Sequence, residues 1–145
     1  MNEIIPNLFL GSMWAGFDPA YLYQQNIHSV LQVCPSNYLL TLKDEQYHIQ
    51  RWIIPVEDDI QTNLLEYFVH TCEWIQYHLR SQKRVLVHCM AGISRSATIV
   101  IAYIMWKFHI RLLEAIHFVE QKRSIIHPNN GFLHQLKLWE QYLFA

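Results

Sequence analysis

The chain has few glycines and no long apolar segment. Only four of its 145 residues are glycine, and no linker, internal repeat or low-complexity tract interrupts the sequence. The longest unbroken apolar segment, residues 99–106, is too short to cross a bilayer. The first residues also lack a basic segment followed by an apolar stretch. We therefore expect one domain over residues 1–145, with no secretory leader and no membrane insertion.

Neither sign of charge is in excess. Eleven Lys and Arg side chains oppose twelve Asp and Glu, which leaves a formal net charge of −1. Proteins that bind the phosphates of nucleic acids usually carry a basic surface, so no nucleic-acid partner is expected. Because 52% of the residues are hydrophobic, the chain can still bury a substantial core.

Cysteine is scarce, and no metal-binding pattern is present. The three cysteines, Cys34, Cys72 and Cys89, are odd in number and have no framework spacing. This predicts free thiols in a reducing compartment, the cytoplasm or the nucleus. The sequence has no Cys-x-x-Cys and no His-Glu-x-x-His, which are the spacings of common zinc sites. No metal or cofactor is expected.

Short apolar segments alternate with apolar stripes at helical spacing, which predicts an α/β fold. Strands are predicted within residues 4–11, 29–33, 49–56 and 85–87. Helices are predicted over residues 18–25, 65–79, 97–106, 112–123 and 132–143, with a mixed loop and short helix in 38–47. We expect a central, mostly parallel twisted sheet with helices on both faces.

Two local signals refine this pattern. Asp18 followed by Pro19 predicts a helix start, with the aspartate as N-cap and the proline in the first helical position. Cys72 lies in the apolar stripe of residues 65–79, so it is predicted to be a core residue without a chemical role.

The segment Val-Leu-Val-His-Cys-Met-Ala-Gly-Ile-Ser-Arg-Ser at 85–96 predicts an anion site. A loop between a strand and a helix offers backbone N–H groups without helical partners, and the helix dipole favours negative charge there. Gly92 lets the backbone curl, and Arg95 adds a planar fork of donors that suits two phosphate oxygens. The same donors would stabilise an ionised Cys89 and aim it at phosphorus.

The string His-Cys-x5-Arg-Ser at 88–96 resembles the phosphate-binding loop of cysteine-dependent protein phosphatases, and in particular their dual-specificity branch. Residues 5–11, 54–58 and 130–136 are also similar to segments of that family, so the resemblance covers the chain. It implies the protein tyrosine phosphatase-like fold of dual-specificity phosphatases, in a compact, atypical form made of the catalytic domain alone.

The resemblance also implies roles for the loop residues. Cys89 would be the nucleophile and form a phosphocysteine intermediate, while Arg95 would bind the phosphate. His88 would orient the loop and keep the cysteine ionised, although a buried core histidine explains it as well. Ser96 would assist departure of the thiolate, with capping of the following helix as the alternative. The other phosphate-binding positions are Met90, Ala91, Gly92, Ile93 and Ser94.

The proton for the leaving oxygen has to come from outside this loop, which has no carboxylic acid. Asp58, 31 positions before Cys89 on a loop that follows a strand, has the family's spacing and is the predicted general acid. Asp59 is the alternative, and at least one carboxylate among residues 57–59 is expected to be only solvated. Asn130 resembles a structural anchor of the family, but we favour helix N-capping for it.

Cys34 raises a separate hypothesis. It ends a strand predicted to run parallel to the strand before Cys89, and the carboxyl ends of parallel strands meet at one edge of a sheet. Cys34 could therefore form a protective disulfide with an oxidised Cys89. The alternative, a small buried apolar side chain, is favoured over it.

The substrate is predicted from what surrounds the loop motif. The five residues between Cys89 and Arg95 carry no cation, which disfavours highly charged inositol lipids. The sequence also lacks the Trp-Pro-Asp of the tyrosine-specific branch, so the resemblance implies a shallower site for phosphotyrosine, phosphoserine and phosphothreonine of proteins. We expect a phosphorylated protein as the partner and favour a monomer. The alternatives are a phosphoprotein-binding module with little turnover and a phosphatase of lipid, glycan or RNA.

Overall fold

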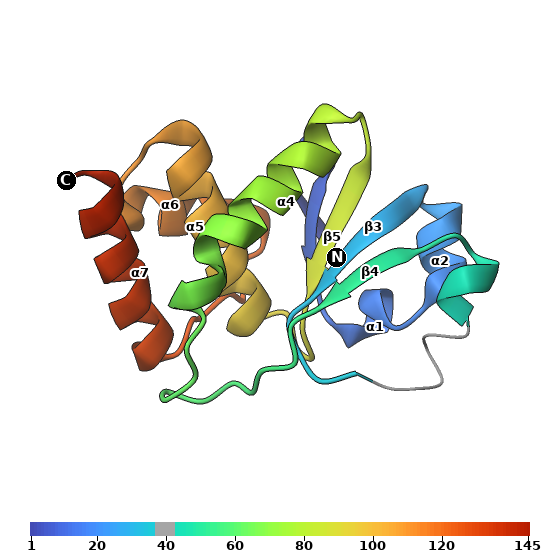
Figure 1. Cartoon of the computed structure of the whole chain (residues 1–145), viewed down its shortest axis with the longest axis horizontal. Helices are drawn as coiled ribbons and strands as arrows, with labels where there is room; N and C mark the ends of the chain where they lie inside the picture. Colours follow the sequence, from blue (N-terminus) through green and yellow to red (C-terminus); the bar gives the residue numbers. More distant parts are fainter. Residues whose placement is uncertain (37–42) are drawn as a thin grey trace.

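The computed structural model describes residues 1–36 and 43–145, and these build a five-stranded sheet between two layers of helices (Figure 1). The strand order is β1-β2-β5-β3-β4; β1 is antiparallel to β2, and all other neighbours are parallel. The strands are β1 (Asn2–Ile5), β2 (Leu8–Gly11), β3 (Ile27–Gln32), β4 (Gln50–Ile53) and β5 (Arg84–His88). The predicted mostly parallel sheet is confirmed.

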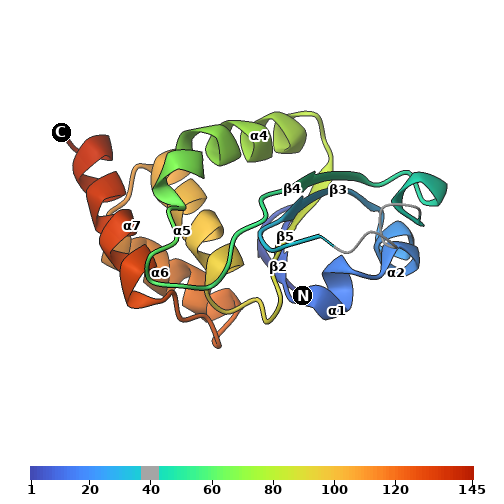
Figure 2. The ribbon, with the colours of Figure 1, turned by 60° about the horizontal axis from the view of Figure 1, so that its bottom comes forward.

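The helices divide between the two faces of the sheet (Figure 2). Two short helices, α1 and α2, contact one face, whereas α4 and α5 contact the other; α6 and α7 pack against α5. Their bounds are α1 (Met13–Gly16), α2 (Pro19–Gln24), α4 (Phe68–Arg80) after the 3-10 turn η1 (Leu65–Tyr67), α5 (Arg95–Phe108), α6 (Leu112–Lys122) and α7 (Asn130–Leu143). In the described part of the chain, no helix is both long and apolar enough to cross a membrane.

Alternation of side chains along the strands separates two apolar clusters, one on each face. On β5, Val85 and Val87 join the larger cluster beneath α4, α5 and α7, while Leu86 joins the smaller one beneath α1 and α2. Residues 8–10 of β2 alternate in the same way. Because successive side chains of a strand point to opposite faces, helices must cover both faces of this sheet. The predicted coverage of both faces is confirmed.

The strands differ from their predicted bounds: β3 begins two residues earlier and ends one residue earlier than predicted, and β5 extends one residue further at each end. The other two predicted strand segments differ more. The segment 4–11 is a hairpin of β1 and β2 rather than one strand, turning at Asn7, whose φ is 72°. The strand predicted over 49–56 ends at Ile53. One further hydrogen bond, from Ile54 N–H to Gln32 O at 2.8 Å, follows it, and then Pro55 contributes no N–H with which to extend the ladder.

The predicted helix start at Asp18 is confirmed, and α2 ends one residue before the predicted position. The Asp18 carboxylate accepts from Tyr21 N–H at 3.1 Å, with Pro19 in the first turn.

Of the mixed segment predicted over 38–47, residues 43–46 are helical, and residues 38–42 lie outside the described part of the chain.

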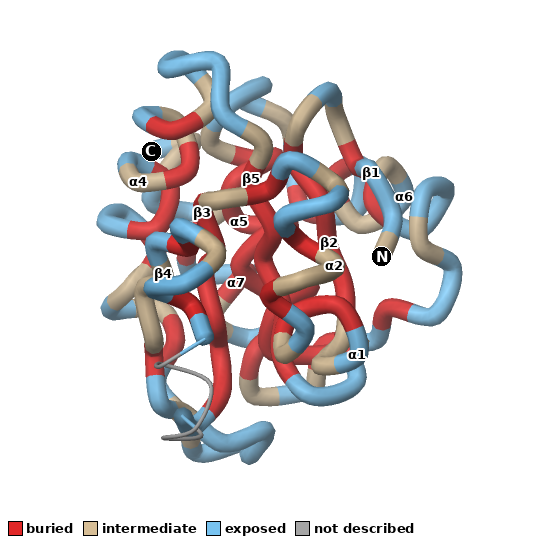
Figure 3. Tube along the Cα trace, turned by 90° about the vertical axis from the view of Figure 1, so that its right-hand side faces the viewer, coloured by how far each residue is buried: buried red, intermediate tan, exposed pale blue. Residues whose placement is uncertain are grey.

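Helix α5 is the centre of the core. Its residues from Arg95 to Met105 are all buried, and Figure 3 shows the buried trace running through α5 and the central strands. Trp139 of α7 donates through Nε1 to the Ala102 carbonyl at 3.1 Å, which ties the C-terminal helix to this centre. Cys72 is buried on α4, in the core as predicted. The first residues of α5 therefore rest on a close-packed base that resists displacement.

We predict that truncating a core leucine destabilises the domain far more than truncating a surface one. Leu136 of α7 is 0% exposed, whereas Leu113 of α6 is 76% exposed. Leu136→Ala should lower the free energy of unfolding by about 2–5 kcal/mol, because it removes buried contacts and leaves a cavity. Leu113→Ala should change it by no more than about 0.5 kcal/mol. Urea unfolding of both variants is the measurement, and equal losses would contradict this packing.

Candidate active site

The predicted anion loop connects the central strand β5 to helix α5. We call residues 89–94 the cysteine loop. Cys89 follows β5 directly and is 2% exposed, so its sulfur lies at the base of the loop. Gly92 has a φ of 69°, a left-handed conformation that glycine adopts without strain. A Cβ at this position would also lie 2.6 Å from the Gly11 carbonyl oxygen of β2, so the loop packs closely on the sheet.

The carbonyl groups of the cysteine loop are bonded to residues outside it. Met90 O accepts from Met13 N–H at 2.8 Å, and Ile93 O accepts from His127 N–H at 2.7 Å. Arg123 donates through Nε to Gly92 O at 2.9 Å and through Nη2 to Ala91 O at 3.2 Å. In a trans peptide the N–H points opposite to the C=O. The N–H groups of residues 91–94 therefore point away from these partners, which is the arrangement an anion site needs.

Arg123 was not predicted to belong to the site. The sequence suggested only a basic residue near the end of a helix, but its guanidinium spans two loop carbonyls and donates through Nη1 to Asn2 Oδ1 at 2.8 Å. Burial is the main cause that lowers its pKa from the usual range. No periodicity or spacing could have shown this contact, because it joins the end of α6 to β1 and to the loop.

Arg95 is buried, and one of its nitrogens is a buried donor without a partner. Its side chain is 7% exposed, and Nη1 donates to the Val56 carbonyl at 2.9 Å. Its Nε is the one buried side-chain nitrogen or oxygen among the described residues without a hydrogen-bond partner. A buried donor left unpaired costs about 1–3 kcal/mol. An oxyanion held by the guanidinium would remove that cost.

Ser96 lies against the sulfur of Cys89. The distance between Ser96 Oγ and Cys89 Sγ is 3.0 Å, and both residues are buried. The N-cap position of α5 belongs to Ser94, which makes no side-chain capping bond. The contact supports an interaction of Ser96 with the sulfur over the capping interpretation.

Asp58 and Asp59 have different surroundings. Asp58 Oδ1 accepts from Asn129 Nδ2–H at 2.9 Å, and Asn129 N–H donates to Ser94 Oγ of the cysteine loop at 3.0 Å. Asp59 instead accepts from Gln61 N–H at 2.7 Å within its own loop. Only Asp58 is thus linked to the cysteine loop through a shared neighbour.

The same contacts correct the expectation for Asn130. The N-cap of α7 is Asn129, whose Oδ1 accepts from Phe132 N–H at 2.9 Å, and Asn130 is the first helical residue. The predicted capping function was therefore placed one residue too late. The adjacent pair of asparagines made the two positions indistinguishable in the sequence.

His88 is fully buried behind Cys89 and hydrogen-bonded on both sides. Its Nδ1 lies 3.0 Å from the Cys89 carbonyl oxygen, and its Nε2 lies 3.1 Å from Nη1 of Arg51 on β4. Burial is the main cause that lowers the pKa of His88 to about 4, so the ring is neutral at physiological pH. Arg51 was not singled out from the sequence, although an arginine within an otherwise apolar strand was the available signal.

Cys34 lies beside the site, two residues after the end of β3. Val33 N–H donates to the His88 carbonyl at 2.8 Å, so the chain segments that lead to Cys34 and Cys89 are adjacent. Cys34 is fully buried and its thiol is free; burial raises its pKa to about 11. Within the described ranges, no group of three or more His, Cys, Asp or Glu side chains is arranged to hold a metal ion.

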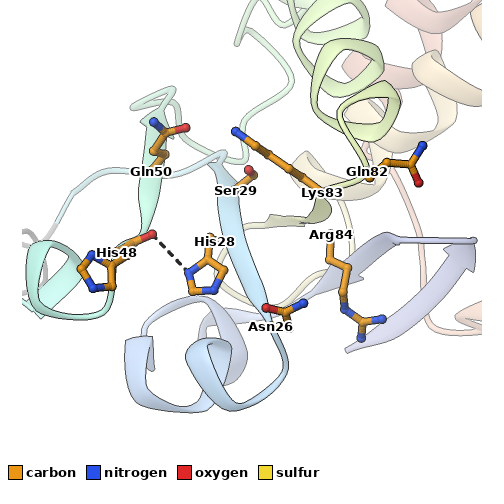
Figure 4. A pocket seen from close by; sticks show the side chains of 8 residues that line it. All are labelled: Asn26, His28, Ser29, His48, Gln50, Gln82, Lys83 and Arg84. Atoms are coloured by element: carbon orange, nitrogen blue, oxygen red, sulfur yellow. Dashed lines mark hydrogen bonds between the residues drawn. The ribbon is translucent and has the colours of Figure 1, made fainter.

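A cavity of about 390 Å³ lies at the amino ends of β3, β4 and β5, away from the cysteine loop (Figure 4). Its side chains do not converge on a common point: Arg84 points away, packs over Phe9 and donates to Gln25 O at 3.0 Å. The cavity is lined by Asn26, His28, Ser29, His48, Gln50, Gln82, Lys83 and Arg84. None of these is a predicted site residue, so the candidate chemistry lies at the opposite ends of the strands.

Comparison with known proteins points to one family. Residues 8–142 match the family described as "Dual specificity phosphatase, catalytic domain". Over 146 aligned residues the chain is 41% identical to human dual specificity protein phosphatase 4 and 38% identical to human dual specificity protein phosphatase 1. Each alignment covers 99% of this chain but only 35% and 38% of those proteins. The chain thus spans about a third of the length of the curated relatives it matches.

Solved structures agree over the whole chain. Human DUSP28 superposes with a TM-score of 0.89 at 28% identity and covers 100% of this chain and 99% of its own. The human tyrosine phosphatase-like serine/threonine/tyrosine-interacting protein superposes with a TM-score of 0.88 at 32% identity, covering 100% and 98%. These similarities confirm the predicted fold and the resemblance seen in the cysteine loop: the chain belongs to the dual specificity phosphatase family and corresponds to its catalytic domain.

Proposed function

We propose that this chain is a cysteine-dependent phosphomonoester hydrolase that removes phosphate from phosphotyrosine, phosphoserine and phosphothreonine of proteins. The observation that carries the proposal is the buried Arg95, whose Nε has no partner at the edge of a loop built around Cys89. A guanidinium with a free donor, a helix start and inward N–H groups together form a binding site for a phosphate dianion.

The reaction would proceed in two steps. The Cys89 thiolate attacks phosphorus, the S–P bond forms as the bond to the leaving oxygen breaks, and Asp58 gives that oxygen its proton. Water then attacks the phosphocysteine and loses a proton to Asp58 as the S–P bond breaks. The Ser96 hydroxyl, 3.0 Å from the sulfur, can donate to the departing thiolate. Arg95 and the loop N–H groups stabilise the charge that develops on the phosphoryl oxygens in both steps.

Protein phosphates fit this site better than inositol polyphosphates. The residues between Cys89 and Arg95 carry no cation, and Arg123, the basic residue beside them, already donates to two loop carbonyls and to Asn2. A headgroup with several phosphates would find little further positive charge here. The relatives at 38–41% identity are named as protein phosphatases, which supports the same substrate class. We also infer a monomer that acts in the cytoplasm or the nucleus.

A second candidate function is phosphoprotein binding with little turnover. One structural neighbour, at 32% identity, is named a phosphatase-like interacting protein rather than a phosphatase. The fold alone therefore does not guarantee hydrolysis. The presence of Cys89, Arg95 and Asp58 together favours the enzyme.

The purified chain should hydrolyse para-nitrophenyl phosphate, and Cys89→Ser should abolish that activity, because serine is a far weaker nucleophile at neutral pH. A panel of phosphopeptides and phosphoinositides should show release of phosphate from the peptides, including phosphotyrosine and phosphothreonine. Binding of phosphopeptide without turnover would instead favour the binding module. Preferential release from inositol lipids would contradict the assigned substrate class.

Asp58→Asn should slow phosphate release from alkyl phosphates by about 10²–10⁴-fold, because the leaving alkoxide then receives no proton. Asp59→Asn is the matched control and should leave the rate nearly unchanged, since that carboxylate caps a turn of its own loop. Measuring kcat for both variants with a phosphoserine peptide decides between them. The reverse order of effects would assign the acid to Asp59.

We further propose that Cys34 can protect an oxidised Cys89 by forming a disulfide with it. The adjacent chain segments and the burial of both residues support this pairing. A sulfenic acid on Cys89 would be attacked by the Cys34 sulfur, with loss of water as the S–S bond forms. The raised pKa of Cys34 opposes the step, because the attacking species is the thiolate.

Brief peroxide treatment, followed by mass mapping without reduction, should recover a peptide that links Cys34 to Cys89. Cys34→Ser should convert that product into irreversible sulfinic acid on Cys89 and slow recovery of activity after a reductant is added. Cys72→Ser is the control, because Cys72 lies on α4 in the core and should not affect the product. Sulfinic acid on Cys89 in the unmodified chain, with no linkage to Cys34, would contradict the proposal.

A further inference from the structure

A buried ion pair lies behind the cysteine loop. Arg51 of β4 donates to the Asp44 carboxylate through two nitrogens, Nε to Oδ2 at 2.6 Å and Nη2 to Oδ1 at 2.9 Å. The two side chains are 5% and 9% exposed. Taking such a pair out of water is costly, and apolar replacements are often as stable. Stability alone therefore does not explain why these charges are here.

The third nitrogen of Arg51 reaches the active site. Nη1 lies 3.2 Å from Gln32 Oε1 and 3.1 Å from His88 Nε2. A guanidinium can only donate, so the Nε2 atom that it faces must present a lone pair. The proton of the neutral His88 ring then lies on Nδ1, which donates to the Cys89 carbonyl at 3.0 Å.

Packing does not select this tautomer. The Phe17 ring meets the His88 ring edge to face at a centroid distance of 5.2 Å, and Gly16 lies so close that a Cβ there would overlap the ring. These contacts hold the plane of the imidazole but are the same for either position of its proton. The alternative tautomer would set Nε2–H against the Arg51 donor and the Nδ1 lone pair against the Cys89 carbonyl. Only the hydrogen-bond partners therefore distinguish the two forms.

The tautomer matters because the Cys89 carbonyl belongs to the first peptide group of the loop. Its partner in that trans peptide is Met90 N–H, which points the opposite way. The next four carbonyls are held by Met13, Arg123 and His127, none of which depends on a tautomer. The orientation of Met90 N–H, the first N–H after Cys89, thus depends on the proton of His88.

From this geometry we propose that Asp44 and Arg51 form a positioning pair for the active site: Arg51 fixes the Nδ1–H tautomer of His88, and His88 thereby holds the first peptide group of the cysteine loop. Asp44 fixes the orientation of the guanidinium by accepting hydrogen bonds from two of its nitrogens. Gln32 supports the arrangement, because its Nε2 also donates to the Cys34 and Pro35 carbonyls at 3.1 and 2.9 Å. The kinetic part of this proposal depends on the proposed hydrolase activity; the tautomer does not.

The first test is NMR of the unmodified chain labelled with ¹⁵N-histidine. Long-range ¹H–¹⁵N spectra at neutral pH should show the His88 proton on Nδ1, with the signals assigned by their loss in His88→Asn. A proton on Nε2, or protonation of both nitrogens, would overturn the proposal whether or not the chain is an enzyme. The NMR measurement therefore distinguishes failure of the tautomer proposal from failure of the proposed hydrolase function.

The second test removes the pair without leaving a buried charge. Arg51→Met with Asp44→Leu should still fold, because both charges are replaced by apolar groups of similar size. We expect mixed His88 tautomers and a kcat for para-nitrophenyl phosphate that is lower by about 10–100-fold, with a smaller change in KM, since the misdirected N–H acts mainly in the transition state. A folded double variant with the Nδ1–H tautomer and unchanged kcat would overturn the proposal.

Two further variants keep the test decisive. Arg51→Lys retains a donor and a charge, so it should preserve the tautomer and most of the activity even where the double variant is poorly folded. A folded Arg51→Lys variant could instead show mixed His88 tautomers and full activity. That result would mean that activity does not depend on the tautomer, and it would overturn the proposal. Arg84→Met is the matched control: it removes a half-buried arginine of β5 at the strand end remote from the loop, and it should alter neither tautomer nor kcat.

Discussion

The site depends on one constraint: the carbonyl groups of residues 89–93 are all hydrogen-bonded to groups outside the turn of the loop. Cys89 O faces His88 Nδ1, and the next four accept from Met13, Arg123 and His127. If the carbonyl groups of a short loop were free, its peptide groups could rotate, and the N–H groups would no longer point toward one anion. With its carbonyls held outward, its N–H groups converge without reorganisation when an anion binds, which is the condition for strong electrostatic stabilisation.

The partners of those carbonyls come from distant parts of the chain. Met13 belongs to α1 on one face of the sheet, whereas Arg123 and His127 follow α6 on the other. β5 lies between β2 and β3 and is contacted by α1 on one face and by α4 and α5 on the other, so its carboxyl end is enclosed at both edges and on both faces. The same central placement buries the first turns of α5 and keeps Arg95 and Ser96 in fixed positions. The fold and the site are therefore stabilised by the same contacts.

The distribution of polar groups within the core also marks the site. The interior beneath α4, α5 and α7 is almost wholly apolar, whereas buried charge collects behind and beside the cysteine loop at Asp44, Arg51 and Arg95. Buried charge is costly unless it is paired, and here each group has specific partners apart from Arg95 Nε. Departures from an apolar core are expected where function requires them. In this chain they outline the candidate active site and the network that supports it.

The sequence by itself determined the elements and the centre of the site. Apolar periodicity predicted the longer helices α4, α5, α6 and α7 to within a few residues, whereas the four-residue helix α1 was not predicted. The strand, loop and helix around Cys89 are local in sequence, as are the N-cap at Asp18 and the left-handed Gly92. What only the tertiary structure decided is which distant side chains meet: Arg123 with the loop carbonyls, Arg51 with His88, and Asn129 with Asp58. Periodicity and capping are set by neighbours three or four residues apart, whereas these contacts join residues 31 to 71 positions apart and exist only after the helices have packed on the sheet.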